Sequence, residues 1–362
     1  FKQKTAYEIR LSLVGSEMCI RDRDALIFAA MLILMLAGLG RYGLYEPHEA
    51  HFAGVGREMV TRGDWVTPHL NGAPYLNKPP LLYWFIALSY TVLGTINEFA
   101  ARLPLALIGF AGCVISWQWA RELSGIKAAR MAAVMLMASA GWYLFSHQLM
   151  IELLLCVLYL ASSYLLWKAI GEPDRRKHWA AFYVMVALNV LAKGPVGLAM
   201  SACVLMGFAA CRRDGSLLRK SRPLMGAMII LVLTAPWLTL MELRNPGYLR
   251  YALISENVNR ALDRRWPPDY DVVKVGVIPF LLAGLVWLAP WSLLAPQVVA
   301  YVREFGRTTS RTSTSRRRSP TSFRRRRSSH PRVRCRSTTC TSTIAISFTS
   351  ATGSRVACTS WK

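Results

Sequence analysis

Long apolar runs alternate with short polar stretches along most of the chain, and this pattern predicts the fold. A helix of about 20 apolar residues crosses the hydrocarbon core of a bilayer. Runs that approach or exceed this length cover residues 25–41, 81–95, 103–120, 128–146, 149–169, 179–193, 195–211, 224–240 and 274–301. We therefore predict an all-α protein, a polytopic bundle of transmembrane helices.

The basic residues between the runs predict the topology, because lysine and arginine favour the cytoplasmic side of a membrane. The run 81–95 either crosses the membrane or lies in its interface. If it lies in the interface, every basic cluster falls on one side: Arg121/Lys127/Arg130, Arg175/Arg176/Lys177, Arg212/Arg213/Arg219/Lys220 and Arg303. We therefore predict eight spans, an inside N-terminus, and an outer first loop over 42–102 that carries interfacial helices.

Composition and the position of the charge exclude two other classes of protein. The chain is 53% hydrophobic and only 18% charged, which excludes a single soluble domain. Its net charge of +24 would suggest a nucleic-acid partner, but residues 307–362 alone hold thirteen Arg and one Lys without any acid. Because the excess lies in one terminal stretch, we predict no nucleic-acid partner.

The two ends differ in composition from the middle, and we exclude both from the predicted fold. Residues 1–23 lack any sustained periodicity and resemble a translated sequencing adaptor, with a natural cytoplasmic tail as the alternative. Residues 304–362 are rich in Arg, Ser and Thr, which suggests a frameshifted or disordered tail; the alternative is an RNA-binding tail. The predicted transmembrane domain is 24–303.

The predicted topology brings many ionisable residues to the outer face or to the outer end of a span. They are Glu46, His48, Glu49, His51, Lys78, His147, Glu152, Lys193 and Glu256. Charges near a membrane boundary are costly unless they are solvated or paired, and they often mark a functional site. Glu152 and Lys193 are each embedded in apolar sequence, so we predict that they form a carboxylate–ammonium pair or bind an anion.

The first loop begins with two carboxylates and two imidazoles within six residues, Glu46 to His51. If the chain is helical from Pro47, His48 and His51 share one face at i, i+3. The spacing differs from the HExxH pattern of zinc proteases, whose histidines lie at i, i+4. A metal held by His48 and His51 remains an alternative, but we assign no metal ligand. Arg57 continues the predicted helix, which ends at Gly63.

Lys78-Pro79-Pro80 holds an ammonium group on a stiff backbone just before the interfacial run 81–95. A cation at that level is well placed to bind a lipid phosphate. The alternative is an ordinary lysine that extends its side chain to the interface.

Four motifs carry a resemblance to a known family: EPHEAHFAGVGREMVTRGDWVTPHLNGAPYLNKPPLLYW, NEFAARLP, LAKGPVGL and APWLTLMELRNPGYLRYALISENVNR. In this order and spacing they resemble the bacterial aminoarabinose transferases and protein O-mannosyltransferases, a group of integral-membrane GT-C glycosyltransferases. The resemblance covers about 24–303 and implies a bundle of the GT-C type. It also implies transfer of a sugar from a polyprenyl-phosphate donor to lipid A or a protein hydroxyl, at the periplasmic or outer face of the bacterial inner membrane.

Several positions depart from the family pattern. The first-loop Asp and Arg of the aminoarabinose transferases are replaced by His48 and His51, whereas Glu49 matches. Some members of the family bind a metal through a glutamate and a histidine, and these positions read Asn77 and Asn257 here. The resemblance therefore leaves a divalent metal in doubt, and we expect no certain cofactor.

The sequence thus predicts a polyprenyl-phosphate-sugar-dependent glycosyltransferase. We expect a first-loop group to remove the acceptor proton: Glu49 or Glu46, with His48 as the competitor. Glu49 could instead pair with Lys78 or Lys193. The residues expected to bind substrate are Lys78, Lys193, Glu152, His51, Arg57 and Glu256. The alternative function is a flippase or transporter of lipid-linked sugar that uses the same cations for binding alone.

Overall fold

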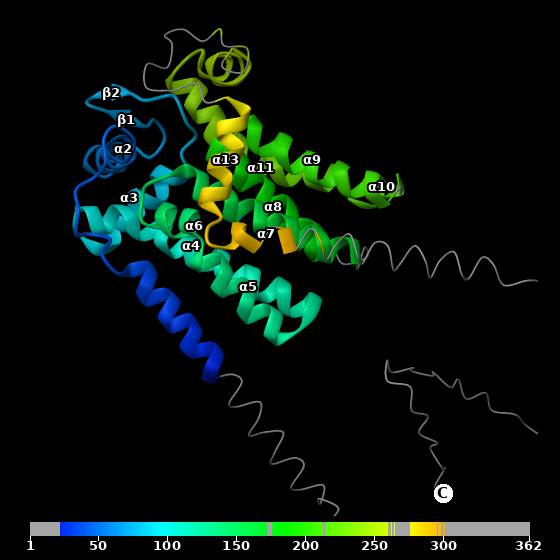
Figure 1. Ribbon diagram of the computed structural model, residues 1–362. Coiled ribbons are helices and arrows are strands. Elements are labelled where there is room, and N and C mark those ends of the chain that lie inside the picture. The colour runs from blue at the N-terminus through cyan, green and yellow to red at the C-terminus, as the bar shows by residue number, and fades with distance from the viewer. Residues whose placement is uncertain are drawn as a thin grey trace, which may run out of the picture. The chain divides into compact units, whose positions relative to one another are not determined.

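The computed structural model describes residues 22–171, 176–212, 215–259, 262, 264, 276–294, 296–297 and 300. Within these residues helices dominate, and the predicted all-α fold is confirmed (Figure 1). The interpretations of the two ends concern residues 1–23 and 304–362, which lie outside the described residues except for residues 22 and 23.

The elements follow one another as short first-loop pieces and then longer helices. After a helix over residues 22–36 come α2 (His48–Arg62), β1 (His69–Leu70), β2 (Ala73–Pro74) and α3 (Leu81–Leu93). The longer helices are α4 (Glu98–Ser124), α5 (Ile126–Ala138), α7 (Ile151–Gly171), α8 (Arg176–Lys193), α9 (Pro195–Arg212), α11 (Pro223–Arg244) and α13 (Val277–Trp287). Shorter pieces are α6 (Ala140–Ser146), α10 (Ser216–Lys220), α12 (Tyr248–Arg250), the π-helix η1 (Tyr251–Asn259) and the 3₁₀-helix η2 (Trp291–Leu294).

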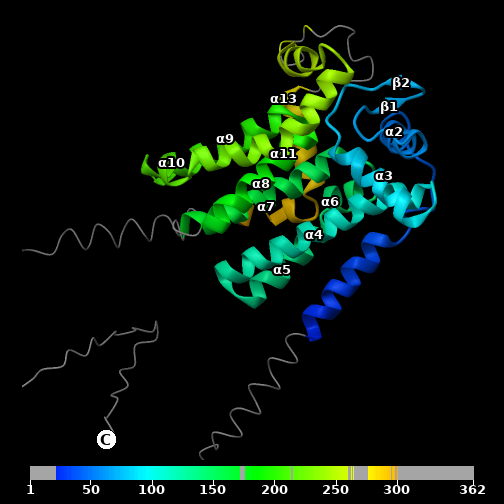
Figure 2. The same ribbon diagram turned by 180° about the vertical axis from the view of Figure 1, so that it is seen from behind.

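Helix α4 and helix α8 connect the bundle. Helix α4 packs against α3, α5 and α7, whereas α8 packs against α7, α9 and α11. Figures 1 and 2 show α7, α8 and α11 side by side in both views. The largest group of buried apolar residues joins the first loop to α4, α7, α8 and α11, so the core is concentrated at the end of the bundle that holds the first loop.

Local sequence signals explain the elements of the first loop. Helix α2 ends at Gly63, which takes the left-handed conformation (φ 69°) that favours glycine. The turn Asn71-Gly72 joins β1 to β2 with positive φ at both residues, as a two-residue hairpin requires. This hairpin was not predicted. Helices α2 and α3 approach each other closely at Gly56, where a Cβ atom would lie only 2.5 Å from Ile86 Cγ2. Glycine at this position therefore allows the close contact.

The predicted count of eight spans is not confirmed by the described residues. By length and apolarity, α4, α7 and α11 could each cross a membrane, and a fourth span results if α5 and α6 are counted together. Helix α3, at 13 residues, is shorter than the roughly 20 residues that a crossing needs, which agrees with its predicted interfacial place. Helix α9 is likewise short as an apolar stretch (Pro195–Cys211).

The apolar run 128–146, predicted as one span, forms two helices, because the chain bends by 65° between α5 and α6. Ser139, at the break, is extended (ψ 132°), and the Ala140 N–H donates to the carbonyl of Ala289 instead of continuing the helix. Trp291 Nε1 also donates to the carbonyl of Met135 at 2.7 Å. The run 274–301 is interrupted too: a turn that contains Pro290 separates α13 from η2.

The helices alternate in direction, so their connections gather at two ends. The first loop, the start of α7, the α8–α9 turn and α12–η1 meet at one end, where they line a common cavity. The α4–α5 turn and α10 lie away from α2, β1 and β2 (Figures 1 and 2). The basic residues Arg121, Lys127, Arg219 and Lys220 belong to this second end. The end that faces the cytoplasm stays a prediction from the sequence.

Candidate functional site

A cavity of about 920 Å³ lies at the end of the bundle that carries the first loop. Its lining contains both polar and apolar residues. The polar residues are His48, His51, Asn77, Lys78, Glu152, Lys193, Glu256 and Asn257. The apolar residues include Val190, Leu191, Val196, Leu198, Ile230, Trp237 and Leu238 from α8, α9 and α11. A molecule with a charged head and an apolar tail would find partners of both kinds in this lining.

The turn between α8 and α9 places Lys193 at the cavity. Helix α8 ends at Lys193, Gly194 adopts a positive φ of 72°, and Pro195 begins α9. Glycine and proline are the residues that favour such a stop and restart. A Cβ on Gly197 would lie 2.3 Å from the carbonyl oxygen of Asn189, so only glycine allows α9 to approach α8 this closely. The LAKGPVGL motif therefore holds one lysine in place.

The second lysine, Lys78, precedes two prolines and the start of α3. Pro80 occupies the N-cap position of α3, and its fixed backbone directs the preceding residues toward the cavity. The α8–α9 turn packs nearby, since a Cβ on Gly194 would lie 3.9 Å from Pro79 Cγ. Two motifs more than a hundred residues apart thus bring Lys78 and Lys193 to one cavity, as the sequence predicted.

Each of these lysines faces a carboxylate. Lys193 Nζ lies 3.3 Å from Glu152 Oε1, and Lys78 Nζ lies 3.7 Å from Glu256 Oε2. The pairing of Glu152 with Lys193 is the one that their apolar flanks predicted. The Glu256 side chain is only 6% exposed, whereas the Glu152 side chain is 53% exposed. The charges of the cavity wall are thus balanced, with two ammonium groups and two carboxylates.

The positions at which some family members bind a metal do not suit one in this chain. Asn77 Oδ1 accepts a hydrogen bond from the Tyr251 hydroxyl at 2.8 Å, and Asn257 Nδ2 donates to the carbonyl of Ala252 at 2.5 Å. Zinc prefers cysteine, histidine and carboxylate ligands to neutral amides. Among the described residues, no group of three or more His, Cys, Asp or Glu side chains could hold a metal ion.

Glu49 lies away from the cavity, in a buried ion pair with Arg102. The guanidinium group makes two contacts with the carboxylate, Nε–Oε1 at 2.9 Å and Nη2–Oε2 at 2.7 Å, and both side chains are fully buried. The remaining donors of Arg102 reach the carbonyls of Leu39, Tyr42 and Gly43 at 2.7–2.9 Å. The predicted pairing of Glu49 with Lys78 or Lys193 is therefore wrong.

The surroundings of Glu49 lower its pKa. Burial alone would raise the pKa of this carboxyl group, but the hydrogen bonds from Arg102 and from the N–H groups of Tyr45 and Leu149 outweigh burial. The two N–H contacts are each 2.8 Å long. Glu49 is thus held as a carboxylate that connects the start of α2, helix α4 and the segment before α7. Its neighbour His48 faces the cavity.

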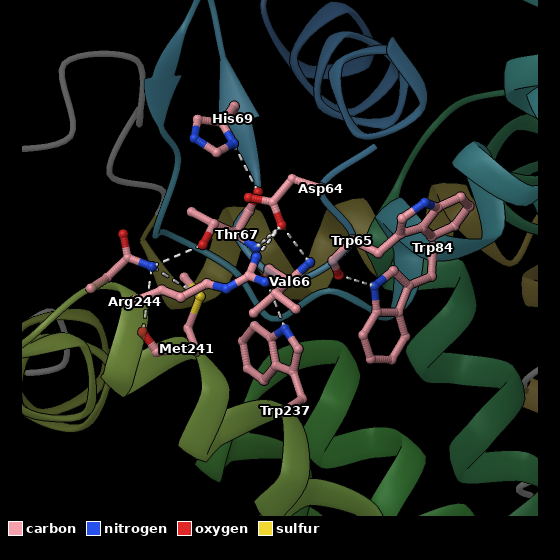
Figure 3. Close-up of polar contacts among 10 residues, drawn as sticks. Asp64, Trp65, Val66, Thr67, His69, Trp84, Trp237, Met241 and Arg244 are labelled. Carbon is pink, nitrogen blue, oxygen red and sulfur yellow. Dashed lines mark hydrogen bonds and ion pairs between the residues drawn. The ribbon is translucent and has the colours of Figure 1, made fainter. Parts of the chain in front are cut away.

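A set of polar contacts fastens the loop after α2 to the end of α11 (Figure 3). Arg244 Nη1 donates to Asp64 Oδ1 at 2.7 Å, and Asn245 Nδ2 donates to Thr67 Oγ1 at 3.0 Å. Trp237 Nε1 donates to the carbonyl of Val66 at 3.0 Å. Because Trp237 also lines the cavity, these contacts fix one of its walls.

The structure brings six of the predicted site residues to the cavity: His48, His51, Lys78, Glu152, Lys193 and Glu256. The other three lie elsewhere: Glu46 and Arg57 are exposed, and Glu49 is buried against Arg102. Sequence reasoning missed Arg102 and Tyr251. The signal for Arg102 was a single charge at the start of an apolar run, which calls for a carboxylate partner.

Fold and site together define an integral-membrane protein with an amphipathic cavity at one end of a helical bundle. A family model described as dolichyl-phosphate-mannose-protein mannosyltransferase matches residues 77–239. The undecaprenyl phosphate-alpha-4-amino-4-deoxy-L-arabinose arabinosyl transferase of Pseudomonas savastanoi pv. phaseolicola is 28% identical over 250 residues, which are 66% of this chain and 45% of the relative. These matches confirm the resemblance to the aminoarabinose transferase and protein mannosyltransferase family of GT-C glycosyltransferases that the sequence motifs indicated.

Other comparisons agree with this assignment. An uncharacterized protein of Aquifex aeolicus is 27% identical over 260 residues, which are 70% of this chain and 51% of that protein. The crystal structure of ArnT from Cupriavidus metallidurans bound to undecaprenyl phosphate matches with a TM-score of 0.70 and 28% identity, over 78% of this chain and 51% of ArnT. The chain thus spans about half the length of the curated relatives that it matches.

Proposed function

We propose that this protein transfers a sugar from a polyprenyl-phosphate donor to an acceptor at the outer face of the bacterial inner membrane. The observation that carries the proposal is the cavity, whose lining combines Lys78 and Lys193 with apolar residues of α8, α9 and α11. A lipid phosphate has the same two parts, a charged head and an apolar chain. The relatives named as undecaprenyl phosphate-dependent arabinosyl transferases support this class of donor.

In the proposed reaction an oxygen of the acceptor attacks C1 of the sugar, and the bond from C1 to the phosphate oxygen breaks. The polyprenyl phosphate leaves with the bonding electrons, so negative charge develops on its oxygen. Lys78 and Lys193 stabilise this charge, an electrostatic contribution that is often the largest one in catalysis. To do so, Lys78 must interact with the phosphate as well as with Glu256, and Lys193 with the phosphate as well as with Glu152.

A hydroxyl acceptor also needs a group that takes its proton. Of the three first-loop candidates, His48 lines the cavity, whereas Glu46 is exposed outside it and Glu49 is bound to Arg102. We therefore assign proton removal to His48 and give Glu49 a positioning role, because it fixes the helical turn that carries His48. If the acceptor is itself an anionic phosphate, as on lipid A, little base catalysis is needed and His48 positions the substrate.

The site faces the outside in this proposal, because the basic clusters Arg121/Lys127 and Arg219/Lys220 lie at the opposite end of the helices. The predicted acceptors, lipid A or a protein hydroxyl, follow from the family alone. His51 and Arg57 were also predicted to bind substrate; we keep this proposal for His51, which lines the cavity, and give it up for Arg57, which does not.

Binding of undecaprenyl phosphate to the protein in lipid nanodiscs tests the proposal. Lys78→Ala should weaken binding at least about tenfold, and Lys78→Arg should weaken it less, because charge is kept while geometry changes. Lys127→Ala is the matched control, since Lys127 is exposed at the other end of the bundle and should leave binding unchanged. Equal binding by all three variants would refute the phosphate role of Lys78.

A second measurement separates the enzyme from the transporter. The protein in liposomes is supplied with a polyprenyl-phosphate sugar and an acceptor, and mass spectrometry follows the glycosylated product. Product formation that depends on Lys78 supports the transferase. Movement of the lipid-linked sugar across the bilayer without any product would instead show the flippase.

A further inference from the structure

Helix α12 and the π-helix η1 form one wall of the cavity. Tyr248, Leu249, Ala252, Leu253, Glu256 and Asn257 from this segment all line it. The segment follows α11 through the turn at Gly247, whose φ of 91° is suited to glycine. Contacts between this segment and the first loop hold the wall in place.

Tyr251 links this wall to the lysine motif of the first loop. Its hydroxyl lies 2.8 Å from Asn77 Oδ1 and 2.9 Å from Glu256 Oε1, so its single proton is shared between the two acceptors. Asn77 is 174 positions away in the sequence, whereas Glu256 lies on the same helix as Tyr251. The other oxygen of the same carboxylate, Glu256 Oε2, faces Lys78 Nζ at 3.7 Å. Both oxygens of Glu256 are therefore in use, one with Tyr251 and one with Lys78.

The amides at positions 77 and 257 stand where some members of the family have a glutamate and a histidine that bind a metal. In this chain Asn77 is an acceptor for Tyr251, and Asn257 is hydrogen-bonded to the backbone of its own helix. An amide cannot supply the negative charge or the imidazole nitrogen that a tightly bound zinc requires. Side chains other than metal ligands must therefore join η1 to the turn that carries Lys78.

We propose that Tyr251, and not a metal ion, joins η1 to the turn that carries Lys78. Its hydroxyl joins Asn77 to Glu256 and holds η1 against the turn that carries Lys78. This link also holds Glu256 through Oε1 when Lys78, which faces Oε2, turns to another anion. Tyr251 is thus a positioning residue, and the attachment of η1 is independent of metal.

Hydrogen–deuterium exchange of the purified protein in nanodiscs tests this link directly. Tyr251→Phe keeps the ring and removes the hydroxyl, and it should raise exchange rates over 251–259 by roughly fivefold, the effect of one lost hydrogen bond. Asn77→Ala removes the partner from the other side and should produce a similar increase. The matched control is Tyr183→Phe, which also removes a hydrogen-bonded phenol hydroxyl, here bonded to the carbonyl of Ser221. Tyr183 is not among the cavity residues, so exchange over 251–259 should stay unchanged. Peptides from α7 report whether each variant is folded.

The same readout tests independence from metal. Addition of zinc, or of a chelator such as 1,10-phenanthroline, should leave exchange over 251–259 unchanged in the wild-type protein. Faster exchange in the presence of the chelator would overturn the proposal, and so would unchanged exchange in folded Tyr251→Phe. Neither measurement needs turnover, so failure here is distinguishable from failure of the proposed transferase activity.

Discussion

Arg102 and Glu49 form a bidentate ion pair in which neither side chain is exposed to solvent. The pair joins residues that are 53 positions apart and lies directly behind the cavity residue His48. A buried charge that loses its partner is very unfavourable, whereas an exposed pair contributes little. The pair is therefore the contact on which the position of the first loop depends most.

The first prediction concerns the stability of the fold. Glu49→Gln should lower the free energy of unfolding by about 3–5 kcal/mol, because Arg102 is left as a buried charge without a carboxylate. Arg102→Lys should also be destabilising, since an ammonium cannot reproduce five directed donors. Glu46→Gln, three residues away and exposed, should change stability by less than about 0.5 kcal/mol. Denaturation in detergent measures all three, and an equal effect of Glu46→Gln and Glu49→Gln would contradict the assignment.

The second prediction is a pH dependence that follows from the lowered pKa of Glu49. A carboxyl group whose pKa is lower in the folded state stabilises the fold above its ordinary pKa of 4.5, and this contribution is lost as the pH falls below that value. The wild-type protein should therefore lose more stability between pH 6 and pH 3 than Glu49→Gln does. Asp64, whose pKa is also lowered, contributes equally to both proteins. Parallel curves of melting temperature against pH would refute the prediction.

The third prediction concerns the proton acceptor. With a hydroxyl acceptor, His48→Gln should lower turnover about 10²–10⁴-fold, the usual contribution of a positioned base. Glu46→Gln should retain turnover within about twofold, because its side chain lies outside the cavity. His48→Asp should be active, since a carboxylate is the family residue at this position. If Glu46→Gln abolished turnover and His48→Gln did not, a shift of the loop would have to bring Glu46 to the substrate.

The fourth prediction tests the sidedness of the bundle. In a chain whose eight native cysteines are replaced by serine, a cysteine at position 46 should react with an impermeant thiol reagent added from outside. A cysteine at position 127 should not react until the membrane is opened. Both positions are exposed in the fold, so burial does not explain a difference between them. Reaction of a cysteine at position 127 in intact cells would contradict the prediction, because this end of the bundle would then lie outside.

The sequence predicted the helices and six of the cavity residues because both depend on local signals. Apolar runs specify helices, and a single charge such as Glu152 or Lys193 within such a run requires a partner. The break at Ser139 was missed because it depends on a contact with Ala289, far along the chain. The role of Glu49 was misjudged for the same reason: nothing near position 49 indicates that Arg102 is its partner.

Tyr251 was missed for a different reason. It lies between Arg250 and the apolar stretch 252–254, and an aromatic ring beside a basic residue suits a membrane interface without any further role. Only the approach of Asn77 and Glu256 gives the hydroxyl its function. Residues whose role is set by partners in two distant segments have no local sequence pattern that could identify them.

The contact between Asn77 and Tyr251 also sets an order of events during synthesis. The ribosome makes Asn77 long before it makes Tyr251, which is 174 positions later. Until then the lysine motif has neither Tyr251 nor Glu256, and the wall of the cavity is missing. The site is therefore assembled only after α11 has been inserted and its end has returned to the side of the first loop. An error in the insertion of any intervening helix would leave the two halves of the site on opposite faces of the membrane.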